Sequence, residues 1–179
     1  MWQVARGMKY LHSAKILHRD IKPANVLINQ DCSIRIADFG LAKVVKELKD
    51  GGQKTPMTDY IATRWYRAPE ILLGGTSYSF PVDVWGFGCV LAEIYIGKPL
   101  FPGSSTLNQL SRIMSVTGLP SQDELLLLGS PLAYEMFKNL YVAEYKIDIG
   151  FLVGDQNASL VDLLEKCLKF DPFKRPTFE

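Results

Sequence analysis

Apolar residues recur at helical spacing in several stretches of the chain. Val4, Met8 and Leu11 lie three or four positions apart, which places them on one face of a helix over residues 1–13. Similar spacing predicts helices over residues 107–116 and 159–169. Residues 79–97 predict a central, buried helix, whose apolar set is Val82, Trp85, Val90, Leu91 and Ile94.

Two short β-prone runs predict a hairpin. Residues 26–28 and 34–36 flank the polar stretch 29–31, which is typical of two strands joined by a turn. Residues 121–145 are apolar but interrupted by glycine and proline, and we interpret the four leucines at 125–128 as one turn of a buried helix. The predicted fold class is therefore mainly α with short β-hairpins.

Composition narrows the class of protein. A chain of 179 residues that is 47% hydrophobic and 22% charged is typical of one globular domain. A net charge of +1 gives no reason to expect nucleic acid or an anionic membrane as a partner. The three cysteines lack metal-ligand spacing, and we expect reduced, mostly buried thiols in an intracellular protein, cytoplasmic or nuclear or both.

Residues able to support phosphoryl transfer lie at both ends of the predicted hairpin. Asp20 could accept a proton from an attacking hydroxyl, and Lys22 could stabilise a negatively charged phosphate. Asn25 enters the hairpin and Asp38 follows its exit, so their oxygens could converge on Mg²⁺. A charged loop could arise by chance, but two such groups in order favour a site.

The motifs around these residues resemble those of eukaryotic protein kinases. Residues 18–25 read H-R-D-I-K-P-A-N and residues 38–40 read D-F-G, which match the catalytic-loop and DFG signatures. T-D-Y at 58–60, followed by A-T-R-W-Y-R-A-P-E at 62–70, resembles the mitogen-activated protein (MAP) kinases. G-K-P-L-F-P-G at 97–103 and D-P-F-K-R-P-T at 171–177 extend the resemblance, which is closest to the atypical, self-activating branch.

The resemblance covers residues 1–179 and implies a domain organisation. It implies the C-terminal (large) lobe of a kinase with the small lobe absent, because no glycine-rich phosphate loop or V-A-I-K-like segment occurs in these residues. Within this lobe it implies a catalytic loop at 18–25, an activation segment at 38–70 and a group-specific insert at about 104–157.

By the same resemblance, ATP and Mg²⁺ are the expected cofactors. Lys22, Asn25, Leu27 and Asp38 would bind them, with Asn25 and Asp38 as the metal ligands. Leu27 would form the floor of the adenine pocket, although a plain core leucine is an equally compatible interpretation. The resemblance adds Thr63 to the catalytic set, as a bridge between the substrate platform and Asp20.

The resemblance also implies a phosphorylation switch and structural contacts. Each phosphate on Thr58 or Tyr60 would add about −1.5 to −2 charges. The expected phosphate-binding residues are Arg19, Lys43, Arg64 and Arg67. A lysine at position 43 lacks the bidentate fork of the arginine that MAP kinases commonly carry there. The expected structural residues are Glu70, which pairs with Arg175, and Asp83, which holds the catalytic-loop backbone.

These inferences predict a MAP-kinase-like Ser/Thr kinase acting on protein substrates with Ser/Thr-Pro sites. The expected partners are an upstream MAP kinase kinase, or the kinase itself in self-activation, and docking peptides near Gln30–Cys32. We expect residues 1–179 alone to transfer no phosphate, because the phosphate clamp is missing. The rival hypothesis is a non-catalytic binding or scaffold module, which a complete upstream coding sequence would distinguish from a fragment.

Overall fold

A computed structural model describes residues 1–45, 61–75, 79–127, 131–138, 140, 146–154 and 157–179. The described chain is mainly helical with two small antiparallel sheets, as predicted. Its helices are α1 (Trp2–Ser13), α2 (Pro69–Leu72), α3 (Pro81–Ile96), α4 (Thr106–Thr117), α5 (Gln122–Leu127), α6 (Pro131–Lys138), α7 (Ile149–Val153) and α8 (Ala158–Cys167). Three 3₁₀ turns span Pro23–Asn25, Ile61–Tyr66 and Pro172–Lys174.

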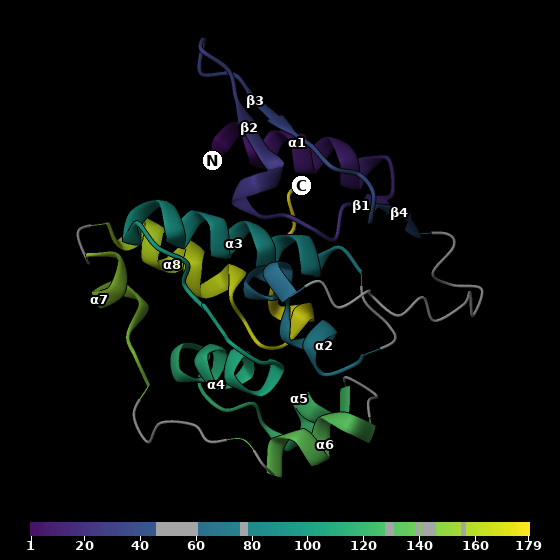
Figure 1. The fold of residues 1–179 in the computed structure, drawn as a ribbon, viewed down its shortest axis with the longest axis vertical. Helices are drawn as coiled ribbons and strands as arrows, with labels where there is room; N and C mark the ends of the chain where they lie inside the picture. The colour runs from purple at the N-terminus through teal and green to yellow at the C-terminus, as the bar shows by residue number, and fades with distance from the viewer. Residues whose placement is uncertain (46–60, 76–78, 128–130, 139, 141–145, 155–156) are drawn as a thin grey trace.

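Helix α3 is the centre of the molecule. Its residues from Val82 to Ala92 are all buried, as expected for a helix that is packed on every side. Figure 1 shows α3 between α1 and α4, and its contacts with α8 are among the most extensive in the fold. The helix ends at Gly97, whose φ of +75° is a left-handed conformation that favours glycine. The predicted burial of Ile94 is wrong, because this residue near the end of α3 is exposed.

Close approach between α3 and α8 depends on a helix-interior glycine. A Cβ atom added at Gly88 would lie 2.9 Å from the Cβ of Cys167 and 3.1 Å from a methyl of Leu168. These two residues are buried at the end of α8. Burial also raises the pKa of the Cys167 thiol to about 11, so this cysteine stays a protonated core residue.

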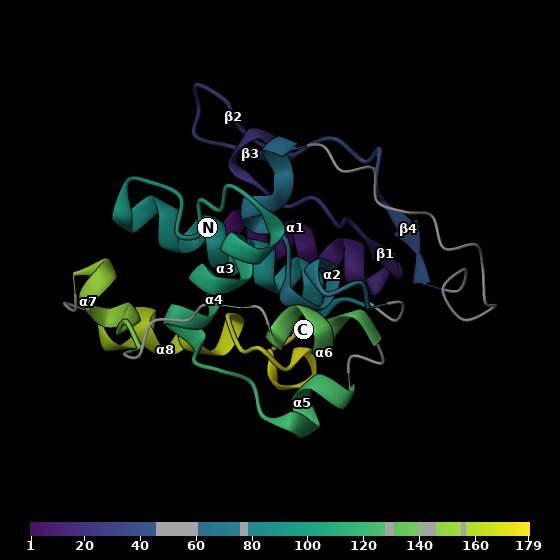
Figure 2. The same ribbon diagram turned by 60° about the horizontal axis from the view of Figure 1, so that its bottom comes forward.

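The hairpin predicted from the sequence is present. Strands β2 (Val26–Ile28) and β3 (Ile34–Ile36) pair with Val26 opposite Ile36 and Ile28 opposite Ile34. In both views the pair projects from the end of the molecule opposite α5 and α6 (Figures 1 and 2). Gln3 of α1 holds the turn, donating to the carbonyl of Cys32 at 3.0 Å and accepting from the amide of Ile34 at 2.9 Å.

Two details differ from the sequence-based expectations, whereas the cysteines agree with them. A second sheet pairs β1 (Ile16–Leu17) with β4 (Lys43–Val44), which no two-residue pattern could indicate. The leucine-rich turn is not buried as predicted, because Leu126 in α5 is 77% exposed and Leu125 is only half-buried. Cys32 is exposed, whereas Cys89 and Cys167 are buried, and all three are free thiols. Within the described residues, no helix has the length and apolar character needed to cross a membrane.

Gly88→Ala is expected to destabilise the protein although alanine favours a helix. Helix propensity gains about 1 kcal/mol, but overpacking against α8 costs about 1–3 kcal/mol. Gly7→Ala in α1 is the matched control, since its Cβ would meet only the terminal methyl of Ile36, at 2.8 Å. Urea-induced unfolding measures both free energies. A Gly88→Ala variant as stable as Gly7→Ala would contradict the packing argument.

Candidate active site

The backbone of residues 18–20 is held by a buried carboxylate from the first turn of α3. Asp83 has no exposed surface and accepts hydrogen bonds from the amides of His18 at 2.9 Å and Arg19 at 2.7 Å. The Nε2 atom of His12 from α1 is also 2.9 Å from this carboxylate. Arg19 has a φ of +70°, which costs a non-glycine residue about 1–3 kcal/mol unless surrounding contacts impose it. Asp83 supplies such contacts.

The loop gathers two polar side chains around one carboxylate. The Oδ2 atom of Asp20 lies 2.7 Å from the Nζ of Lys22 and accepts from the Nδ2 of Asn25 at 3.0 Å. Asn25 Nδ2 also donates to the backbone carbonyl of Asp20 at 2.8 Å. Oδ2 is therefore fully engaged, while Oδ1 makes no hydrogen bond to any described residue. Among the described residues, Oδ1 of this otherwise buried carboxylate is therefore the oxygen that could meet a ligand.

His18 connects this loop to the segment after β3. Its Nε2 contacts the carbonyl of Ala37 at 3.1 Å, and its Nδ1 accepts from the amide of Asp20 at 3.3 Å. Both bonds are satisfied by the tautomer that carries its proton on Nε2. The imidazole also packs edge-on against Phe39, with ring centroids 5.1 Å apart. Sequence reasoning did not assign His18 a role of its own.

Asn25 and Asp38 are placed at neighbouring ends of the hairpin. The amide of Ala37 donates to the carbonyl of Asn25 at 2.9 Å, so the ladder continues to the residue before Asp38. Asp38 is exposed, has a φ of +62° and accepts from the amide of Gly40 with one oxygen at 3.2 Å.

The residues present fit a magnesium ion bound by hard oxygens. Because Asn25 donates to Asp20 twice through Nδ2, its Oδ1 is left as an acceptor among the described residues, and Asp38 likewise keeps its second carboxylate oxygen. Among the described residues no three His, Cys, Asp or Glu side chains gather as an all-protein metal cage. A site of one amide and one carboxylate suits Mg²⁺, which usually keeps waters or phosphate oxygens as further ligands.

Leu27 does not lie in the core. Its side chain on β2 is 51% exposed, so the plain core leucine considered from the sequence is wrong. The next residue of β2, Ile28, is also apolar and exposed. The structure therefore leaves Leu27 accessible at the same end of the fold as Asn25.

The predicted phosphate-binding residues have different environments. Arg19, Asp20 and Arg67 line one small cavity, so the structure brings these three together. Arg19 also donates to the carbonyl of Leu41 through Nε, and Arg64 donates to the carbonyl of Ser104 at 3.1 Å. Lys43 is half-buried in β4 opposite Leu17.

Three of the predicted functional side chains cannot be placed. Thr58 and Tyr60 lie outside the described residues. The backbone of Thr63 belongs to the 3₁₀ turn Ile61–Tyr66, but its side chain is not described.

Glu70 and Arg175 form the ion pair expected from the sequence. Arg175 Nη1 donates to Glu70 Oε1 at 2.7 Å, and Nη2 donates to Oε2 at 2.8 Å. Arg175 further donates to the carbonyls of Lys169, Pro81 and Phe170. All five N–H donors of the guanidinium are thus used. Removing either partner of the ion pair would leave the other charge buried and unpaired.

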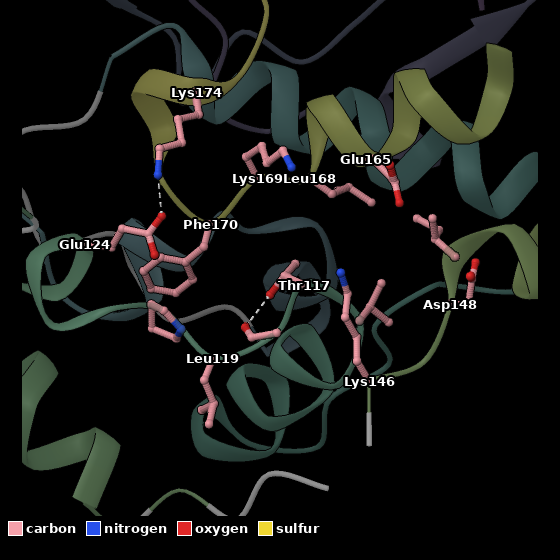
Figure 3. Close-up of a pocket in the computed structure, with 14 residues that line it drawn as sticks. Thr117, Leu119, Glu124, Lys146, Asp148, Glu165, Leu168, Lys169, Phe170 and Lys174 are labelled. Carbon is pink, nitrogen blue, oxygen red and sulfur yellow. Dashed lines mark hydrogen bonds and ion pairs between the residues drawn. The ribbon is translucent and has the colours of Figure 1, made fainter. Parts of the chain in front are cut away.

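A separate cavity of about 330 Å³ lies between the end of α4, α5 and α8 (Figure 3). Its rim carries the ion pair Lys174–Glu124, at 2.9 Å, and the hydrogen bond to Lys174 is the main cause that lowers the pKa of Glu124. No residue of the loop 18–25 lines this cavity. The candidate chemistry and this cavity are therefore distinct.

The family to which this chain belongs follows from comparison with known proteins. The family model of the protein kinase domain matches residues 1–179, and the chain belongs to this family. Its relatives are MAP kinases. It is 44% identical over 180 residues to extracellular signal-regulated kinase 2 of Dictyostelium discoideum, covering 100% of this chain and 48% of that protein.

Two relatives from Caenorhabditis elegans give the same result. Mitogen-activated protein kinase pmk-1 is 47% identical over 177 residues, which cover 99% of this chain and 45% of that protein. Mitogen-activated protein kinase 15 is 43% identical over 182 residues, which cover 100% of this chain and 38% of that protein. The chain thus spans less than half the length of these relatives.

Asp83→Asn is expected to lower the free energy of unfolding by about 1–3 kcal/mol. An amide in place of the carboxylate must turn its NH₂ toward at least one buried donor, which loses its acceptor. Asp31→Asn is the matched control, because Asp31 accepts from the amide of Ser33 in an exposed turn. Urea unfolding of both variants measures the difference. Equal losses for the two variants would show that the three bonds to Asp83 contribute little.

Proposed function

We propose that this chain forms the large lobe of a MAP-kinase-like Ser/Thr protein kinase. In this proposal the γ-phosphate of ATP passes to a Ser or Thr hydroxyl, with proline favoured at the next position. The observation that carries it is the carboxylate of Asp20, whose Oδ2 is held by Lys22 and Asn25 and whose Oδ1 has no hydrogen bond to any described residue. Family membership over the whole chain supports the same reaction class.

Asp20 would receive the substrate hydroxyl at Oδ1. Lys22 and Asn25 fix the plane of the carboxylate through Oδ2, so Oδ1 keeps one direction toward the substrate. The ammonium of Lys22, only 20% exposed, would also stabilise charge on the transferred phosphoryl group. Thr63 is proposed to link the substrate platform to Asp20.

Asn25 and Asp38 would hold Mg²⁺, which supplies charge neutralisation on the phosphates when it is bound. Leu27 would support the adenine ring of ATP, and its exposed side chain is compatible with that role. His18 keeps the two ligand-bearing segments together by bonding Ala37 and packing on Phe39. The exposed apolar residues around Leu27 would be covered by the rest of the kinase.

Regulation is proposed to act through phosphates on Thr58 and Tyr60. Arg19 and Arg67 share a cavity with Asp20, so a phosphate bound by either arginine would be coupled to the catalytic carboxylate. Lys43 and Arg64 would complete the phosphate-binding set. An upstream MAP kinase kinase, or self-activation, would supply the phosphates.

The exposed turn at Gln30–Cys32 is the proposed docking edge for partner peptides. Gln3 fixes this turn from α1, so the edge is rigid before a peptide binds. The domain limits proposed are a catalytic loop at 18–25, an activation segment at 38–70 and an insert at about 104–157. A protein acting in this way would work in the cytoplasm, the nucleus or both.

Asp20→Asn is expected to reduce phosphate transfer by about 10²-fold or more, because a neutral amide cannot accept the hydroxyl proton. The measurement is transfer from labelled ATP to a short Ser-Pro peptide by the intact protein to which residues 1–179 belong. Residues 1–179 alone should transfer none. Asp162→Asn, which alters an exposed carboxylate on α8, is the control and should keep full activity. Transfer that survives Asp20→Asn would contradict the role of Asp20, and an intact protein that transfers no phosphate would favour a scaffold module.

Phosphate is expected on Thr58 or Tyr60 in protein isolated from its own cells. Mass spectrometry of the peptide that spans residues 55–64 measures this modification. The charge-assisted bonds available to arginine make the phosphorylated form the ordered one. Peptides that stay unmodified under stimuli that activate other MAP kinases in the same cells would contradict the proposed switch.

A further inference from the structure

Gln109 of α4 is a polar residue with no exposed surface. Burial of an amide is costly unless both its donor and its acceptor find partners. Its Nε2 donates to the carbonyl of Trp65 at 3.3 Å, and its Oε1 accepts from the amide of Gly103 at 3.0 Å. The two partners belong to different segments, so one side chain joins the Ile61–Tyr66 turn to the loop before α4.

Trp65 and Gly103 also bond each other, which closes a cycle of three residues. The Nε1 of Trp65 donates to the carbonyl of Gly103 at 3.0 Å. Position 103 must be glycine here, because a Cβ would lie 2.6 Å from the Cα of Gln109 and 2.4 Å from its Oε1. Cyclic hydrogen bonding in a buried site fixes the relative positions of all three segments.

Neighbouring residues of the turn are tied to the same region. Arg64 donates to the carbonyl of Ser104 at 3.1 Å, and the hydroxyl of Tyr66 donates to Glu93 of α3 at 2.7 Å. Burial, with this bond to Glu93, raises the pKa of Tyr66, so its hydroxyl remains a donor. Three consecutive residues of the turn are therefore anchored to α3 and the loop before α4, and the Gln109 amide is bonded to the main chain of the turn.

We propose that Gln109 is a positioning residue for the protein substrate, acting through the carbonyl of Trp65. The inference rests on the proposed kinase function, in which residues 63–67 form the substrate platform. Gln109 sets where this platform lies relative to Asp20, and so determines how well a substrate peptide binds. It has no part in binding ATP or in the transfer step itself.

The test compares Gln109→Leu, Gln109→Glu and Trp65→Phe in the intact kinase, with ATP and a short Ser-Pro peptide. Leucine removes both bonds of the amide, whereas glutamate keeps the acceptor for Gly103 but cannot donate to Trp65. Phenylalanine removes only the indole donor. Gln122→Leu, at an exposed position in α5, is the matched control and should behave as wild type.

Both Gln109 variants are expected to raise the KM for the peptide about tenfold, the effect of one lost buried hydrogen bond. The kcat at saturating peptide, the KM for ATP and ATP hydrolysis without peptide should change less than twofold. Equal effects of leucine and glutamate assign the role to the bond with Trp65. An unchanged peptide KM would overturn the proposal, as would a joint fall in kcat and ATP affinity with a lower unfolding temperature. If the Gln109 variants fail to fold, Trp65→Phe, which opens the same hydrogen-bonded cycle at the indole, must also raise the KM for the peptide, or the proposal is wrong.

Hydrogen exchange separates this inference from the proposed function. Gln109→Leu should speed exchange of the amides at residues 64–66 and 103 while leaving those at residues 18–25 protected. Faster exchange in a protein that transfers no phosphate would refute the kinase proposal and the substrate role of Gln109. It would still support the contact by which Gln109 holds the main chain at Trp65. Unchanged exchange at residues 64–66 in an active kinase would refute the role of Gln109 in holding the turn and leave the kinase proposal standing.

Discussion

One buried carboxylate determines the geometry on which the candidate site depends. Asp83 accepts two backbone amides of the catalytic loop and faces His12, so it ties α1, α3 and the loop together. Its place in the first turn of α3 suits a negative charge, because the N-terminal end of a helix is electropositive. The left-handed conformation of Arg19 persists because these bonds impose it. Without them, the backbone that leads to Asp20 would have no fixed position relative to α3.

Buried polar bonds rather than apolar packing place the remaining parts of the site. Arg175 fixes Glu70 and with it the start of α2, while Gln109 fixes the main chain at Trp65. Such bonds are strong only when every donor and acceptor is paired in a dry environment. They also specify one arrangement, because a shifted segment would leave a buried group unpaired. The apolar core around α3 supplies stability, and these bonds supply the position of the chemistry.

The sequence predicted the elements that carry their own periodic signal. Helices α1, α3, α4 and α8 and the hairpin lie within two residues of their expected limits. Pairing of β1 with β4 could not be predicted, because two-residue strands far apart in the chain have no periodicity. The exposure of Leu126 and Ile94 was missed since composition does not say which side of an apolar helix meets solvent. Asp20, Asn25 and Asp38 were predicted as site residues from motifs, whereas the links made by His18 and Gln109 depend on tertiary contacts between distant segments.

The hairpin register has a consequence for how this region can change in evolution. The separation of Asn25 from Asp38 is set by the rungs between β2 and β3, from the Val26–Ile36 pair to the bond of Ala37 with Asn25. The number of residues in the turn does not affect this separation. Insertions at residues 29–33 would lengthen the tip and leave Asn25 and Asp38 in place. A single-residue deletion within β3 would move Asp38 by about 3.3 Å and turn its side chain to the opposite face. Length variation among homologues should therefore accumulate at the tip of the hairpin and be absent from the paired residues of β2 and β3.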